Sequence, residues 1–187
     1  GIENGLKGIR KISATEAREI EPNVRAVQAV LVPEAGIVDY GTVAKKYAEI
    51  FQQNGGQIFL NQKVVQVLDR PQSVVVVTQS TIPNQESLSI EGAVFVNCAG
   101  LYSDHVARLT GEKSKVQIIP FRGEYYELKP ESEHLVRNLI YPVPNVNFPF
   151  LGVHFTRMIH GGIEAGPNAV LAFKREGYSR WDVDLKE

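Results

Sequence analysis

The segment Ala93–Gly111, AVFVNCAGLYSDHVARLTG, decides how the surrounding chain can fold. It opens with the apolar run AVFV (93–96), which is typical of a strand buried on both faces of a sheet. Ala99-Gly100 then form a turn without bulky side chains. Ser103 is expected to cap a short helix that ends at Gly111. In α/β proteins, such a strand, turn and helix present backbone N–H groups to a phosphate or to the polar edge of a cofactor.

The same pattern also has a purely structural explanation, because small residues are common where a strand turns into a helix. Spacing alone leaves both explanations open and favours the structural one. Cys98 is the only cysteine, which excludes an internal disulfide and is typical of a reducing compartment. We expect it to be a small core residue at the end of the strand, because no histidine is paired with it.

The composition and charge of the chain limit the classes of protein to which it can belong. The chain has 187 residues, 43% hydrophobic and 22% charged, which suffices for a globular core in one or two domains. A net charge of −1 without a cluster of basic residues gives no reason to expect nucleic acid as a partner. The longest apolar runs have four or five residues, too few to span a membrane. We therefore expect a cytoplasmic location, with peripheral membrane attachment of the full-length protein left open.

A helix and a series of strands precede the opening segment. Asp39 is predicted to cap a helix over 40–53, which has a broad apolar face and stops at the Asn54-Gly55-Gly56 sequence. Three strands are then predicted, over 57–60, 64–68 and 74–79, followed by a return strand after a turn at Pro83-Asn84. This order predicts a fold of the α/β class, with α+β character, containing one parallel-sheet strand and a β-meander.

Other elements are predicted on both sides of this block. Ser13 and Glu16 form a capping box for a helix over 13–20, which Pro22 ends. Further predicted segments are a strand over 26–32, a half-exposed strand between 115 and 130, a proline-rich loop over 141–150, and two strands over 152–156 and 163–165 joined by a turn at 160–162.

Several stretches resemble a known family. VNCAGLYSD (96–104) is similar to the segment after the last strand of the cofactor domain in the D-amino-acid oxidase superfamily of FAD-dependent oxidoreductases. Phe148–Tyr178, containing FLGVHFT and GPNAVLAFKREGY, closely resembles the L-2-hydroxyglutarate oxidases and dehydrogenases of that superfamily. The resemblance implies that 33–115 form the C-terminal half of an FAD-binding domain. It implies that 1–32 and 116–187 form segments of a mixed-sheet substrate domain.

The resemblance also implies that FAD is the cofactor and that particular residues contact it. The backbone of Ala99 and Gly100 would lie beside the FAD, and the backbone of Val64, or of Val65 with a one-residue slip, would meet the adenine. From the residues alone, both valines would be core positions. No G-x-G-x-x-G pyrophosphate motif is present, and the only methionine is Met158. We therefore expect an internal fragment of a longer enzyme.

Oxidation of a 2-hydroxyacid needs a base for the hydroxyl proton, an electron acceptor, and cations for the carboxylates. His154 is the predicted base, because imidazole titrates near neutral pH and lies in the GVHFT motif. Without that motif, it would be a strand histidine with a structural hydrogen bond. Arg122 is the predicted carboxylate ligand, because a guanidinium offers a planar fork to a carboxylate. Lys174 and Arg175 are expected to face solvent.

Two further substrate contacts are predicted. Tyr125, or Tyr126 in its place, could donate a hydroxyl hydrogen bond, and strand alternation allows only one of them on a given face. An edge-strand aromatic pair explains them equally well. Asn168 lies at a Gly-Pro-Asn turn where the superfamily brings substrate-domain groups to the flavin, although turn formation alone also explains it. No spacing of His, Cys, Asp and Glu indicates a metal site.

The resemblance implies that the full-length protein is an FAD-dependent oxidoreductase that converts L-2-hydroxyglutarate to 2-oxoglutarate, and that this fragment alone is inactive. Its partners would be a small 2-hydroxy dicarboxylate, an electron acceptor that is either oxygen or a quinone, and the remainder of the parent chain. The alternatives are an amine or amino-acid oxidase of the same superfamily, or a noncatalytic module that retains the scaffold.

Overall fold

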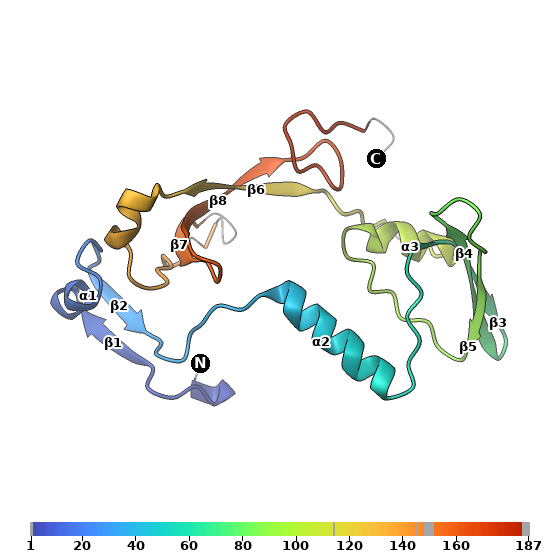
Figure 1. Cartoon of the computed structure of the whole chain (residues 1–187), viewed down its shortest axis with the longest axis horizontal. Coiled ribbons are helices and arrows are strands. Elements are labelled where there is room, and N and C mark those ends of the chain that lie inside the picture. Colours follow the sequence, from blue (N-terminus) through green and yellow to red (C-terminus); the bar gives the residue numbers. More distant parts are fainter. Residues whose placement is uncertain (1, 114, 145, 148–151, 185–187) are drawn as a thin grey trace. The chain divides into compact units, whose positions relative to one another are not determined.

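The computed structural model describes residues 2–113, 115–144, 146–147 and 152–184. It divides into two compact units, one of Gly1–Lys45 with Arg122–Val170 and one of Lys46–Phe121 with Leu171–Glu187. Both contain helices and antiparallel sheets (Figure 1), which confirms the predicted mixed α/β class. The predicted domain segments 1–32, 33–115 and 116–187 divide the chain differently and stay a prediction.

The first unit begins with a short antiparallel pair of strands around a helix. A 3-10 turn, η1 (Ile2–Asn4), precedes β1 (Arg10–Ser13), α1 (Ala14–Ile20) and β2 (Gln28–Leu31). The Ser13 hydroxyl oxygen accepts a hydrogen bond from the Glu16 N–H at 3.2 Å, which confirms the predicted cap of α1. The predicted strand over 26–32 is confirmed at its centre and is shorter at both ends.

A buried carboxylate fixes the end of α1 to a distant part of the same unit. Glu21 follows α1, and its carboxylate accepts hydrogen bonds from the Arg137 N–H at 2.9 Å and from the Asn138 side-chain amide at 2.8 Å. The Asn23 amide donates to the carbonyl of Leu135, the last residue of η3 (Pro130–Leu135), at 2.9 Å. The donors from Arg137 and Asn138 satisfy the buried Glu21 carboxylate, which would otherwise lack partners, and the exposed Asn23 bond adds a second link to the same region.

A three-stranded sheet forms the centre of this unit. Its strands β6 (Phe121–Glu127), β7 (His154–Arg157) and β8 (Ile163–Leu171) have the order β6-β8-β7, and Ile163 is fully buried. The predicted pair of strands is confirmed, with a tight turn at Gly161-Gly162 where both glycines have positive φ angles. Ile140 forms an antiparallel bridge with Phe155, which adds a short segment beside β7. Of the predicted loop 141–150, residues 145 and 148–150 lie outside the described residues.

The predicted helix over 40–53 is present as α2 (Tyr40–Gln53), and the boundary between the two units falls inside it. Asp39 caps it as predicted, since its carboxylate accepts hydrogen bonds from the Gly41 N–H at 2.9 Å and the Thr42 hydroxyl at 2.5 Å. The apolar face is not buried, however: no residue of α2 is buried within the part of the chain that the structure describes.

The second unit contains the predicted β-meander. Its strands are β3 (Gln62–Arg70), β4 (Ser73–Ser80) and β5 (Ser89–Gly92), antiparallel in that order, and the turn at Pro83-Asn84 joins β4 to β5 as expected. Val67 of β3 and Val75 of β4 are buried. A 3-10 turn, η2 (Gly100–Tyr102), leads into α3 (Ser103–Leu109), which packs near β3.

Four predictions, three of them within the opening segment, are wrong. Residues 57–60 and 93–96 are not strands, since no described strand pairs with them. Without a neighbouring ladder, their backbone groups lack β-sheet partners, and Val94 and Val96 stay 79% and 72% exposed. Cys98 is exposed and not a core residue. Ser103 is the first residue of α3 and no cap, because its hydroxyl donates to the Gly100 carbonyl at 2.8 Å.

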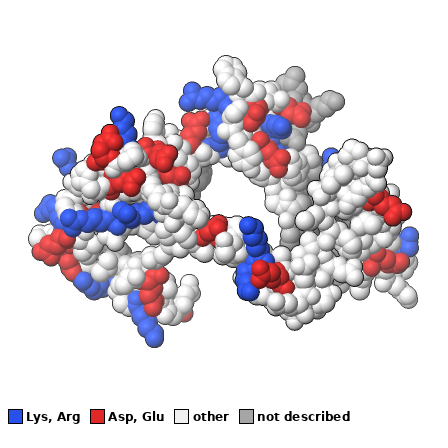
Figure 2. Space-filling model, viewed as in Figure 1, with Lys and Arg blue, Asp and Glu red and all other residues white. Residues whose placement is uncertain are grey.

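Acidic and basic side chains are interspersed over the face displayed in Figure 2. Among the described residues, no helix is both long enough and apolar enough to cross a membrane.

Candidate functional site

His154 lies in a row of side chains that crosses the sheet of the first unit. It is the first residue of β7 and is paired with Gly166 of β8. Tyr125 of β6 lies across Gly166, because a Cβ placed on that glycine would be 2.6 Å from the Tyr125 Cδ1. The Tyr125 ring reaches His154 edge-on, with 6.4 Å between ring centroids. The missing side chain of Gly166 therefore lets two residues from the outer strands meet over the central one.

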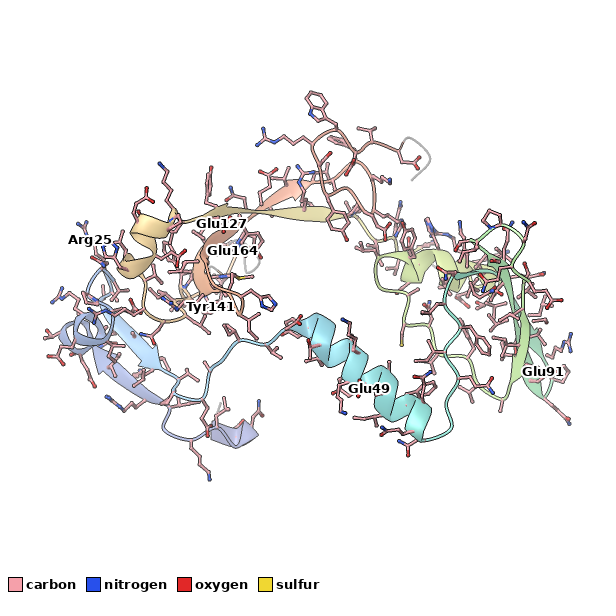
Figure 3. All side chains as sticks on the ribbon, viewed as in Figure 1. Arg25, Glu49, Glu91, Glu127, Tyr141 and Glu164 are labelled. Atoms are coloured by element: carbon pink, nitrogen blue, oxygen red, sulfur yellow. The ribbon has the colours of Figure 1, made fainter. Side chains whose placement is uncertain are left out.

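The row continues on the other side of His154. Tyr141 follows the Ile140 bridge to Phe155, and its ring stacks on the imidazole with 4.5 Å between centroids (Figure 3, in which Tyr141 is labelled). The Nδ1 atom of His154 lies 3.1 Å from the Thr156 hydroxyl oxygen. The imidazole is thus held between two aromatic rings and oriented by a hydroxyl two residues along the same strand, which leaves Nε2 as the nitrogen that could act on a substrate. The sequence analysis did not find Tyr141 or Thr156.

Arg122 is not brought to this row. Side chains alternate across a strand, so Arg122 lies on the opposite face of β6 from Tyr125. It forms an ion pair at 2.9 Å with Glu124, which lies on its own face. Arg122 and His154 therefore lie on opposite faces of the sheet, and carboxylate binding by Arg122 stays a prediction. The Glu124 carboxylate also offsets the positive charge of Arg122, which would otherwise attract a substrate carboxylate.

The other predicted substrate residues lie on the same sheet. Tyr126 points to the face opposite Tyr125 and is exposed, so alternation selects Tyr125 as the neighbour of His154. Asn168 is exposed on β8, two residues after Gly166 and next to the cis Gly166-Pro167 bond. Its predicted role in substrate binding is untested by these contacts.

The predicted cofactor turn, Ala99-Gly100, lies in the second unit and is held by side-chain hydrogen bonds. Asn97 accepts from the Ala99 N–H at 3.2 Å and donates to the Ser103 carbonyl at 2.8 Å. Gly100 has a φ of +55°, and a Cβ placed on it would meet nothing within 4 Å. Among the described residues its N–H has no hydrogen-bond partner. The turn thus offers one backbone donor beside open space, as contact with a cofactor requires.

Val64 lies on β3 at an irregularity of the ladder. Val64 pairs with Thr78 and Gln66 pairs with Val77, so Val65 is an extra residue without a partner on β4. Such bulges leave backbone groups outside the ladder and occur next to binding sites. The bulge gives a physical reason why the backbone of Val64 or Val65 is available to a ligand, and the contact with adenine stays a prediction.

Arg175 forms a buried ion pair with the segment that follows the cofactor turn, and the sequence analysis missed it. Its guanidinium donates to both carboxylate oxygens of Asp104, at 2.7 and 2.8 Å, and also to the Leu101 carbonyl. Only 4% of Arg175 is exposed, so the expectation that it faces solvent is wrong. The Arg175 guanidinium holds the pKa of the Asp104 carboxyl well below its usual range. The guanidinium also lies over the Tyr102 ring, 5.8 Å from its centroid.

The residues of the second unit fit part of an FAD contact. The open space at Gly100 and the free amide of the turn suit the edge of a flavin nucleotide, whereas no Gly-rich pyrophosphate motif is present in the sequence. No group of His, Cys, Asp and Glu that could hold a metal ion occurs among residues 2–113, 115–144, 146–147 and 152–184.

Comparison with known proteins shows the family to which the chain belongs. The sequence profile of the family described as "FAD dependent oxidoreductase" matches residues 2–186. The chain belongs to this family, and the predicted cofactor FAD is confirmed at the level of the family.

Three relatives of the chain share one name within the family. The chain is 54% identical over its whole length to L-2-hydroxyglutarate dehydrogenase of Indibacter alkaliphilus. It is 43% identical to the mitochondrial L-2-hydroxyglutarate dehydrogenases of Caenorhabditis elegans, over 96% of the chain, and of Homo sapiens, over 100% of the chain. These alignments cover 45%, 41% and 42% of the respective relatives. The chain thus spans less than half the length of these relatives, as expected for a fragment.

Proposed function

We propose that the full-length protein containing this chain oxidises L-2-hydroxyglutarate to 2-oxoglutarate. The single observation that carries the proposal beyond the relatives' names is the position of His154 between Tyr125 and Tyr141, with Thr156 at its Nδ1. A histidine fixed in this way suits removal of a hydroxyl proton, because only one ring nitrogen is left for the substrate.

Bound FAD would supply the acceptor for the hydride that leaves carbon 2 of the substrate. His154 accepts the hydroxyl proton at Nε2. This requires that Nδ1 carries a proton and donates a hydrogen bond to the Thr156 hydroxyl oxygen. Stacking on Tyr141 keeps the imidazole plane fixed while the charge changes. Tyr125 lies edge-on to the imidazole and offers its hydroxyl to the substrate. This mechanism rests on His154 and not on Arg122, because Arg122 faces the other side of β6.

The relatives are named dehydrogenases, so we propose an electron acceptor other than oxygen, such as a quinone. Anaerobic reduction of the purified full-length flavoprotein by L-2-hydroxyglutarate, followed by reoxidation with air or with a quinone analogue, separates the two acceptors. Reoxidation in air as fast as turnover would refute this choice. The cellular location stays a prediction.

The test of the site is His154→Gln in the full-length protein, with His160→Gln as the matched control. His160 is an exposed histidine of the turn between β7 and β8. Loss of the base is expected to lower kcat by about two to four orders of magnitude with flavin content unchanged, whereas the control stays active. Equal kcat values for the two variants would remove His154 from the mechanism. Reduction by an amino acid, and not by 2-hydroxyglutarate, would favour the alternative oxidase.

A further inference from the structure

Two segments of the second unit that are 71 positions apart in sequence meet in one buried cluster. Asp104 belongs to the first turn of α3, directly after η2, and Arg175 belongs to the segment after β8. The side chains in this ion pair are 4% and 1% exposed. A guanidinium that donates to both oxygens of one carboxylate is fixed in direction as well as in position.

The same guanidinium also reaches the backbone of the turn. It donates to the carbonyl of Leu101, the residue after Gly100, and it lies over the ring of Tyr102. Asp104 in turn accepts a hydrogen bond from the Ile118 N–H at 3.4 Å. Arg175 therefore contacts three residues of the segment 101–104, whereas a Cβ placed on Gly100 would meet nothing within 4 Å. Arg175 thus holds the segment that follows Gly100, while the Cβ position of Gly100 stays open.

We propose that Arg175 is a positioning residue for the FAD-contacting turn Ala99-Gly100, acting through Leu101 and Asp104. The inference rests on the predicted contact between this turn and FAD, and not on the identity of the substrate. Arg175 fixes the direction of the Gly100 N–H by holding the carbonyl of the following residue and the first turn of α3. Without it, the turn samples other conformations, and FAD has to select the competent one, which weakens binding by the competent fraction.

Arg108 supplies a matched control. It pairs with the same carboxylate, at 3.4 Å from Asp104, but its side chain is 43% exposed and no described hydrogen bond joins it to the turn backbone. Arg108→Met therefore removes one positive charge beside Asp104 without removing the support of Leu101. Arg175→Lys keeps the charge but loses the fork that spans the carboxylate and the carbonyl.

The experiment measures FAD affinity of the full-length apoprotein by fluorescence titration, well below the melting temperature. A uniform loss of stability does not change the dissociation constant there, because the unfolded fraction stays negligible. Arg175→Lys and Arg175→Met are expected to weaken FAD binding at least about tenfold and to speed amide hydrogen exchange of residues 99–104 in the apoprotein. Arg108→Met should change neither.

Arg175→Lys is the variant expected to fold even if Arg175→Met does not. Unchanged FAD affinity in Arg175→Lys, with or without a lower melting temperature, would show a merely structural ion pair and overturn the proposal. Faster exchange of residues 99–104 with unchanged FAD affinity would show that the turn is held by Arg175 but does not contact FAD, which also overturns it. Failure to oxidise L-2-hydroxyglutarate would refute the proposed activity and leave these affinities interpretable.

Discussion

Gly166→Ala is the sharpest test of the row formed by Tyr125, Gly166 and His154. A Cβ at residue 166 would lie 2.6 Å from Tyr125 Cδ1, 2.9 Å from its Cγ and 3.0 Å from the Glu124 carbonyl oxygen. Rotation of the tyrosine ring relieves the first contact, but the carbonyl belongs to the backbone of β6 and moves only with the strand. Overpacking of this kind costs about 1–3 kcal/mol. The displaced Tyr125 ring would also lose its edge-on contact with the His154 imidazole.

The stability effect is measured as the melting temperature of the full-length protein, where about 1–3 kcal/mol corresponds to a loss of several degrees. A double-mutant cycle then isolates the ring. Tyr125→Ala removes the ring atoms but leaves the Glu124 carbonyl. We therefore expect Gly166→Ala to cost less in the Tyr125→Ala background, with a coupling of about 0.5–3 kcal/mol.

Gly36→Ala is the matched control, because its φ is outside the left-handed region and nothing lies within 4 Å of its Cβ position. It is expected to leave stability unchanged or to raise it by about 0.4–1 kcal/mol, through the unfolded chain. If Gly166→Ala melted with the wild-type protein, or cost the same with and without Tyr125, the packing of Tyr125 over Gly166 would be refuted.

Three further outcomes follow from the described contacts. Asp39→Ala should lower the melting temperature by removing the cap of α2, and Asp39→Asn should recover most of the loss; equal melting of both variants and wild type would contradict the cap. Because the Asp104 pKa is lowered in the folded state, its stabilisation is complete above about pH 5 and declines as pH falls below about 4. The melting difference between wild type and Arg175→Met should therefore shrink from pH 7 to pH 3; a constant difference would contradict this. Arg122→Met and Glu124→Gln should both lower the melting temperature and leave KM within about twofold of the wild-type value. A much larger rise in KM for Arg122→Met alone would support its predicted contact with a substrate carboxylate.

The parts of the fold that the sequence predicted are those with a local cause. The boundaries of α2 follow from Asp39 at one end and the Asn54-Gly55-Gly56 stop at the other, all within the helix or next to it. The β-meander follows from β-branched runs separated by turn residues, and each strand pairs with its sequence neighbour. Such interactions join residues close in the chain, so their pattern is visible without the tertiary structure.

The apolar runs 57–60 and 93–96 show where this reasoning stops. Their composition reports a preference for burial and for extended backbone, which they share with real strands. A strand also needs a ladder of hydrogen bonds with a neighbour, and nothing in either run identifies that neighbour. Among the described residues no strand pairs with them, so they form no strand and most of their side chains are exposed.

In the candidate site, too, the sequence predicted which residue types matter but not which partners the fold gives them. His154 was predicted from its motif and its chemistry, whereas its position depends on Tyr141 and on the absence of a side chain at Gly166, which only the sheet brings together. Arg122 and Arg175 are the clearer contrast. The arginine beside a glycine was expected at a ligand and lies against Glu124, while the arginine in a charged tail was expected in solvent and is buried on Asp104. A guanidinium has the same chemistry in both places, so its role is decided by which carboxylate the fold places opposite it, and that partner can lie anywhere in the chain.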